Sequence, residues 1–145
     1  MAHFDPGDYR DHGRLAARLS RPILTELGYS PQEVEAICYA IAVHVDDKAD
    51  FEHEPTLEAA IVSDADNVDR FGAYRILLWC ANDLYNFEAL VATLRERLER
   101  LYSYRGKRMM GTDAGQKLFD EHLERQITFF ESVVAEQAIT RLDIN

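Results

Sequence analysis

The 145-residue chain has few of the residues that would place it in several common classes of protein. It has only two cysteines, Cys38 and Cys80, too few for a disulfide-stapled secreted domain. Both lie in apolar sequence typical of helices, where a free cysteine behaves as a small hydrophobic residue, so we expect neither a disulfide nor catalysis from them. No apolar run approaches the ~18 residues of a membrane span. The segment Met1 to Asp5 also lacks the features of a signal peptide, and we expect a cytoplasmic protein.

Positive charge is scarce too. There are 16 lysines and arginines against 26 acidic residues, which gives a formal net charge of −10. Phosphate contacts with nucleic acid need clustered basic residues, so nucleic acid is not an expected partner. A membrane is not expected as a partner either, because no apolar run is long enough to span one. The one basic cluster, 95–108, interleaves with Glu96 and Glu99 before it enters a loop. It is typical of a solvated helix face followed by a basic turn, and a phosphate site there is the alternative.

Proline and glycine are sparse, at four and seven residues, and no segment has the alternation of a half-buried strand. We therefore expect an all-α protein, one single-domain helical bundle of about six helices over residues 1–145. The expected helices run from about Asp8 to Leu27, from Pro31 after the cap Ser30, from Leu57 after the cap Thr56, from Ala73 to Leu84, from Phe87 after the cap Asn86, and from Thr112 and Asp113 to about Glu136.

Individual residues indicate where helices begin, bend or face the core. Pro22 should kink or split the first helix. Ser30, Pro31 and Glu33 form a capping-box pattern at the start of the second helix. The almost continuously apolar segment around Trp79 is expected to be the centre of the core, and residues 46–55 to be a polar loop. The other residues expected to face inward are Leu90, Val91, Leu94, Leu98, Leu101, Leu118, Phe119, Leu123, Ile127, Phe129, Phe130 and Val134.

Three aspartates, Asp64, Asp66 and Asp69, lie in an otherwise apolar segment that has no glycine before Gly72. Helical spacing places Asp66 and Asp69 on one stripe and Asp64 on the next, so at least one must face inward. An ionised carboxylate is costly to bury unless a cation or several hydrogen-bond donors meet it. The cluster therefore indicates either a metal ion or a dense hydrogen-bond network.

Two histidines continue the apolar stripes of their helices. His12 shares a stripe with Leu15 and Leu19, and His44 follows Ile41 on the next helix. Each histidine alone is more typical of a core or boundary residue than of a metal ligand. Together with the three aspartates, however, the two histidines favour a functional site. His53 and His122 are expected to be solvated.

The sequence contains none of the common motifs of catalytic or phosphate-binding sites that we searched for. There is no glycine-rich phosphate loop, no pair of cysteines at CxxC spacing and no locally supported Ser-His-Asp order. Imidazole and carboxylate ligands together suit a divalent metal such as manganese, iron, zinc or nickel, with positions left open for water and substrate.

Three stretches resemble the HD-domain superfamily of phosphohydrolases. They are Asp11-His12-Gly13 with Ala16, the run 40–44 that ends in His44, and the segment 58–72 with its Asp-Ala-Asp helix and following Gly72. The end of the chain, from Gly111 to Glu136, is also similar to the end of small bacterial members. The resemblance implies an all-α bundle that hydrolyses a nucleotide or related phosphate ester with a divalent metal ion, for which magnesium is a further candidate.

The resemblance also implies roles for individual residues. Asp66 matches the acidic metal ligand, and His12 and His44 match histidines that bind a second metal, contact the substrate phosphate or assist proton transfer. Four further residues are implied in supporting roles. Asp64 and Asp69 would lie behind the ligand or be structural, and Asp47 and Lys48 would lie at the rim of the site.

One part of the family pattern is missing, because the family has a His-Asp pair, and a further histidine before it, upstream of the segment that matches His12. The chain starts where that helix would end, and His3 with Asp5 is a poor substitute. Three explanations stay open: a truncated enzyme, a non-catalytic binding or dimerisation module that keeps the bundle, or a site assembled from His3, His12, His44 and Asp66. Because lost helices would uncover apolar surface, we also expect a homo-oligomer.

Overall fold

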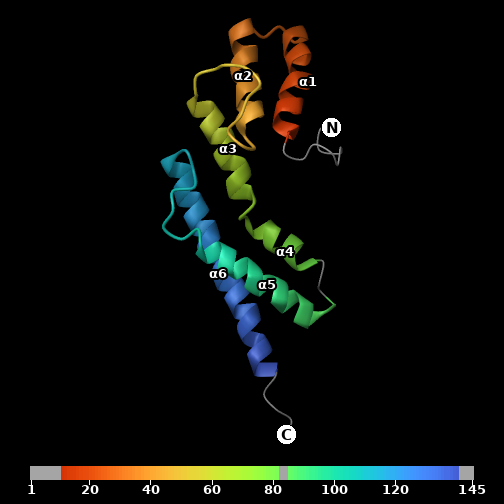
Figure 1. Ribbon diagram of the computed structural model, residues 1–145, viewed down its shortest axis with the longest axis vertical. Coiled ribbons are helices and arrows are strands. Elements are labelled where there is room, and N and C mark those ends of the chain that lie inside the picture. Colours follow the sequence, from red (N-terminus) through yellow and green to blue (C-terminus); the bar gives the residue numbers. More distant parts are fainter. Residues whose placement is uncertain (1–10, 82–84, 141–145) are drawn as a thin grey trace. The chain divides into compact units, whose positions relative to one another are not determined.

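The computed structural model describes residues 11–81 and 85–140, with side chains up to residue 137. This part of the chain contains six helices and no strand (Figure 1), which confirms the all-α class. They are α1 (His12–Glu26), α2 (Pro31–Val43), α3 (Leu57–Asp69), α4 (Ala73–Ala81), α5 (Phe87–Tyr102) and α6 (Asp113–Thr140). None of these helices is long and apolar enough to cross a membrane. The candidates His3 and Asp5 lie outside the described residues, as does Leu84, the expected end of α4.

The chain divides into two compact units, Met1–Asp66 and Asn67–Asn145, and the division falls within α3. They are called the first and second unit below, and each is described by itself. The single domain expected from the length of the chain stays a prediction.

In the first unit α1 packs against α2, and the short connection 27–30 makes the two helices antiparallel (Figure 1). The helices approach closely at Gly13, where a Cβ would lie 2.6 Å from the carbonyl oxygen of Ala42. Small residues fill the space between them, with Ala17, Cys38 and Ala42 all buried. Pro22 lies inside α1, which it does not split.

Caps define the start of α2 and of α3. Ser30 Oγ accepts from the backbone N–H of Glu33 at 3.3 Å, and the Glu33 carboxylate accepts from the backbone N–H of Ser30 at 2.8 Å. This reciprocal pair is the predicted capping box, and its hydrogen bonds from Ser30 lower the pKa of Glu33. Thr56 caps α3 as expected, since its Oγ1 accepts from Ala59 N–H at 3.1 Å. The loop 46–55 is less polar in its contacts than predicted, because Phe51 packs against the α1–α2 core.

In the second unit α5 and α6 pack together and α4 contacts α6. The predicted stripe of α5 is confirmed, since all five of its apolar residues are buried. On α6 the side chains of Phe119, Leu123, Ile127 and Phe130 are at most 1% exposed. The caps Asn86 and Thr112 accept from Ala89 N–H and Gly115 N–H, as expected.

Three predictions about this core are wrong. Segment α4 is not its centre, because Leu77 is 64% exposed, Leu78 42% and Trp79 36%, and Ile76 is its buried residue. Leu118 and Phe129 on α6 are also exposed, at 48% and 43%. Every residue of α4 except Arg75 is apolar, but only Ile76 is buried, and sequence periodicity does not reveal which side of such a helix is covered.

Candidate functional site

His12 and His44 come together at one end of the α1–α2 pair. His12 is the first residue of α1 and His44 is the C-cap of α2, so the antiparallel packing brings these two helix ends side by side. Their ring centroids are 5.2 Å apart with an interplanar angle of 71°. Both residues are half-buried. The stripe predicted to face inward on α1 is wrong in part, because Leu19 is 51% exposed. Residues on two separate helices thus form one imidazole pair.

The orientation of the His44 ring is set by the backbone of its own helix. Nδ1 lies 2.6 Å from the carbonyl oxygen of Ile41, an acceptor, so in a neutral ring this nitrogen carries the proton. The lone pair is then on Nε2, which can accept a proton or bind a metal ion. A protonated ring would instead offer Nε2–H as a donor to an anion such as phosphate.

A network of charges extends from this pair along α1. Arg14 lies two residues after His12, and Asp46 lies two residues after His44. Arg14 Nη1 donates to the two carboxylate oxygens of Asp46 at 2.9 and 3.2 Å. Arg14 Nε donates to Asp11 and lies 3.7 Å from Asp50 Oδ1. The hydrogen bond to Asp11, followed by the contacts with Asp46, raises the pKa of Arg14. This network ties the segment after α2 to the start of α1.

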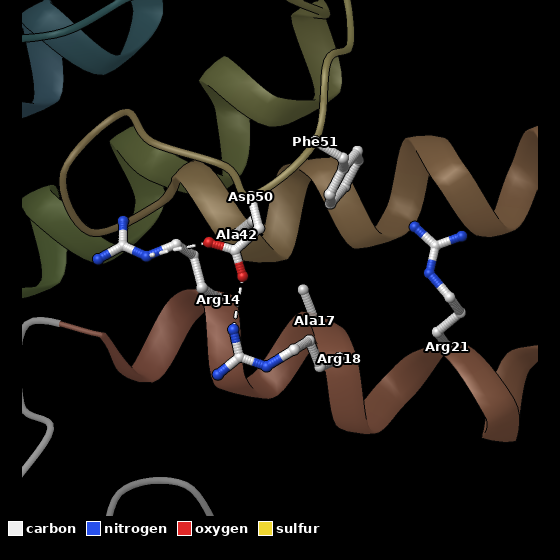
Figure 2. A pocket seen from close by; sticks show the side chains of 7 residues that line it. All are labelled: Arg14, Ala17, Arg18, Arg21, Ala42, Asp50 and Phe51. Atoms are coloured by element: carbon white, nitrogen blue, oxygen red, sulfur yellow. Dashed lines mark hydrogen bonds and ion pairs between the residues drawn. The ribbon is translucent and has the colours of Figure 1, made fainter.

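The network borders a small cavity of about 90 Å³ between α1, α2 and the loop (Figure 2). In Figure 2 the Asp50 carboxylate points towards both Arg14 and Arg18, and Arg18 Nη1 donates to it at 2.5 Å. Arg21, further along the same face, has its Cζ 5.3 Å from the centroid of the Phe51 ring. The cavity is too small for a nucleotide. The contacts of the three arginines with Asp50 and Phe51 hold the loop against α1.

Sequence reasoning missed this arginine face. A signal was present in the spacing of Arg14, Arg18 and Arg21, which recur at four and three residues and so share one side of a helix. The acidic loop 46–50 was the other half of the signal. Arginines on a helix and acids in a loop are both usual on solvated surfaces, so neither half by itself indicated a contact with the other.

The predicted rim residues Asp47 and Lys48 are exposed, directly after the end of α2. Asp47 has a φ of 58°, in the left-handed region that aspartate tolerates better than most residues, and its N–H donates to Val43 O at 2.9 Å. These contacts turn the chain out of α2. The role of both residues at a site stays a prediction.

The three aspartates of α3 differ in burial. Asp64 is 6% exposed, which confirms that at least one of them faces inward. Asp66, the expected metal ligand, is half-buried, and Asp64 and Asp66 each take part in further interactions. Asp69 is exposed and pairs with Arg75 at 2.6 Å in the second unit, so its surroundings are those of a surface ion pair. Asp64 is therefore the member of the cluster whose charge the fold must accommodate.

Within the described residues, no three histidine, cysteine or acidic side chains lie close enough together to hold a metal ion. His12 and His44 are brought together, but Asp66 does not complete a three-ligand group with them. The assignment of a divalent metal to these residues stays a prediction.

The two other described histidines are not simply solvated, contrary to expectation. His53 stacks on Tyr39 with ring centroids 4.6 Å apart, and its Nδ1 lies 2.7 Å from Glu54 O. His122 is half-buried, with Nδ1 3.3 Å from Val68 O. Each takes part in local packing within its own unit, which makes both useful controls. Cys38 and Cys80 are free thiols, as predicted.

No family model matches this chain, and no curated protein and no solved structure is significantly similar to it. A functional assignment for this chain therefore rests on its own residues and their geometry.

Proposed function

We propose that the chain is an HD-domain-like phosphohydrolase domain that binds the phosphate of a nucleotide or related ester at the His12–His44 pair. The observation that carries the proposal is the 5.2 Å separation of the two rings. The sequence resemblance singled out these two residues one by one, without reference to their separation. Their meeting in space is what a shared role in one site requires.

The pair can act on a phosphate group in two ways. Protonated imidazoles donate hydrogen bonds to phosphate oxygens, and a neutral imidazole can take a proton from an attacking water or return one to a leaving group. His44 is oriented for this by its contact with Ile41 O. Arg14, two residues after His12, donates to Asp46, two residues after His44. The proposal thus assigns phosphate binding and proton transfer to His12 and His44.

A divalent metal fits this site only in part. Two imidazoles are suitable donors for manganese, iron, zinc or nickel, but the described residues supply no third ligand beside them. We therefore derive no metal-dependent step, and the hydrolytic part of the proposal rests on the sequence resemblance. The lack of a third ligand within this part of the chain favours a second candidate, a non-catalytic module that binds the phosphate ester at the same pair.

The test is binding and turnover by the full chain purified without a metal-affinity tag. Metal content is measured by elemental analysis, binding of inorganic phosphate and of AMP by calorimetry, and phosphate release with added manganese. The variants are His12→Gln, His44→Gln and Asp66→Ala. The matched controls are His53→Gln and His122→Gln, which remove imidazoles outside the pair.

Binding that is lost in His12→Gln and His44→Gln but kept in both controls would support a phosphate site at the pair. Phosphate release that also disappears in Asp66→Ala would support the enzyme, whereas binding without release would support the non-catalytic module. If neither phosphate nor AMP binds, or if the control variants lose binding equally, the proposal is wrong.

A further inference from the structure

In the first unit, α3 presents an apolar face to solvent. Ile61 and Val62 are 51% and 42% exposed, and Leu57, one turn before Ile61, is 65% exposed. Ala65, one turn after Ile61, is exposed as well. Ala59 lies two residues before Ile61, on nearly the opposite side of the helix, and is only 4% exposed. The four exposed residues are called the α3 face below, and exposed apolar residues gathered on one element mark a site of association.

Acidic side chains lie within the α3 face and before it in the chain. Glu58 is exposed, three residues before Ile61 and four before Val62, so it is a neighbour of both on the helix surface. Glu52 and Glu54, in the loop that leads into α3 (Figure 1), are exposed too. None of these three glutamates forms an ion pair with another described residue. Their charges are therefore available to a cationic group of a partner.

The first unit has few basic residues with which to balance these glutamates. Residues 1–66 contain 14 acidic and five basic residues, whereas residues 67–145 contain 12 and 11. The three arginines of α1 already form ion pairs, which leaves Lys48 as the other basic residue described in this unit. The negative charge of the chain is thus concentrated in the unit that carries the α3 face.

The exposed apolar residues of α1 have different surroundings. Leu19 and Ile23 are 51% and 58% exposed and lie four residues apart, so they also share one side of a helix. The charged side chains of α1 are mostly arginines, and these are paired with acidic residues of the same unit. The charges along α1 therefore do not indicate the charge of a partner, whereas the unpaired glutamates near α3 do.

We propose that the α3 face binds a basic amphipathic helix of another protein. The apolar side of that helix would cover Ile61 and Val62, and its lysines or arginines would lie next to Glu58. Such helices carry apolar residues three and four positions apart, with basic residues between them. A second copy of this chain does not fit, because pairing through the α3 face would bring like charges together. A small cation would neutralise the glutamates but would leave the apolar residues exposed. Binding at the α3 face does not depend on the proposed phosphate site.

The test measures the binding of a dye-labelled synthetic peptide to the full chain by fluorescence anisotropy. The peptide consists of leucine and lysine, with the leucines at helical spacing so that they form one side of a helix. We expect saturable binding that weakens as sodium chloride is added, because salt screens the attraction between lysine and glutamate. Ile61→Ser and Glu58→Lys should each raise the dissociation constant at least about tenfold, because one removes apolar contact and the other replaces attraction by repulsion.

The matched controls are Ile23→Ser and Glu26→Lys, which make the same two changes at exposed positions of α1 in the same unit. They should leave the dissociation constant unchanged, and circular dichroism should show that all four variants are folded. A second peptide with glutamate in place of lysine should not bind. A third peptide, with the leucines and lysines reordered so that no apolar side forms, should bind at least about tenfold more weakly.

Several results would overturn the inference. The first is that the parent chain does not bind the leucine–lysine peptide, or binds the glutamate or reordered peptide equally well. The second is that Ile61→Ser or Glu58→Lys binds the peptide as tightly as the parent. The third is that the control variants on α1 weaken binding as much as the variants on α3, which would mean that the peptide responds to the overall charge and hydrophobicity of the chain.

Discussion

The two units of this chain are stabilised in different ways. In the second unit, large side chains such as Leu94, Phe119 and Phe130 are completely or almost completely buried. The core of the first unit consists mainly of alanine, valine and cysteine, with ion pairs at its edge. Because the hydrophobic contribution grows with the apolar area removed from water, the second unit should be the more resistant to unfolding. The His12–His44 pair thus belongs to the unit that depends more on close backbone approach and on charge.

The largest effect should come from a large core residue of the second unit. Phe130→Ala should lower the free energy of unfolding by about 3–5 kcal/mol, because it removes a fully buried ring and leaves a cavity. Its neighbour Phe129, which is 43% exposed, offers a control at the next position in sequence. Urea denaturation of Phe129→Ala should show a loss below about 1 kcal/mol. Equal losses for the two variants would mean that the burial described for α6 is wrong.

In the first unit the substitution expected to destabilise the packing of α1 against α2 is at a glycine. Gly13→Ala places a methyl group 2.6 Å from the carbonyl oxygen of Ala42, so α1 and α2 must move apart. We expect a loss of about 1–3 kcal/mol, in spite of the higher helix propensity of alanine. Hydrogen exchange should accelerate in α1 and α2 and remain unchanged in α5 and α6. Unchanged exchange in α1 and α2 would contradict the close approach of these helices.

Helix caps allow the same chemistry to be compared in both units. Ser30→Ala and Thr112→Ala each remove one oxygen that accepts from a helix N–H, which costs about 1 kcal/mol. The loss should appear in hydrogen exchange of α2 for the first variant and of α6 for the second. If Ser30→Ala accelerates exchange in both units alike, they do not open independently.

The Ser30 cap also has a pH dependence of known sign. The pKa of Glu33 is lowered in the folded chain by its hydrogen bonds with Ser30, so the unfolded chain binds more protons at acid pH. The stabilisation is present above the unfolded value of 4.5 and is lost as the pH falls through the lower folded value. Glu33→Gln should therefore destabilise the chain at pH 7 and lose much of that effect in acid. Thermal melts of the parent chain and of Glu33→Gln, at pH 7 and at a pH below 4.5, measure how much of the destabilisation is lost in acid.

The smallest effect should come from the ion pairs, and it should depend on salt. Arg14→Gln removes contacts to Asp46 and Asp11 and should loosen the end of α2 that carries His44, more at low than at high ionic strength. Because the pKa of Arg14 is raised, its charge is constant through neutral pH, and raising the pH to 9 should not reproduce the effect. The matched control is Arg75→Gln, which breaks the more exposed pair with Asp69. The chemical shift of the His44 ring protons provides the measurement, and a larger shift with Arg75→Gln would contradict the prediction.

Features encoded by neighbouring residues could be predicted from the sequence. Ser30, Thr56 and Asn86 all act as the caps that their residue types indicated, and the buried stripe of α5 follows its apolar spacing. Features set by tertiary packing could not. The periodicity of α4 left open which side of the helix is covered, and Phe129 and Phe130 are equally apolar although only one of them is buried.

The same distinction applies to the candidate site. His12 and His44 could be singled out by residue type and position, whereas the contact between them depends on the antiparallel packing of α1 and α2. The Arg14–Asp46 pair joins two segments that are far apart in sequence. The spacing of the arginines shows that they share one side of a helix, but it does not show that the acidic loop lies against that side. The family resemblance selected Asp66, and the structure instead buries Asp64 most deeply among the three aspartates.

The two free thiols are placed so that each unit carries one of them. Cys38 is completely buried between α1 and α2, where its Sγ lies 3.5 Å from Ala17 O, and Cys80 is half-buried at the end of α4. Burial raises the pKa of both thiols, which keeps them in the unreactive protonated form while their helices stay packed. A thiol-specific reagent would therefore modify each cysteine at a rate that follows the opening of its own unit. The chain thus carries two built-in kinetic probes, one for each unit, without any engineered label.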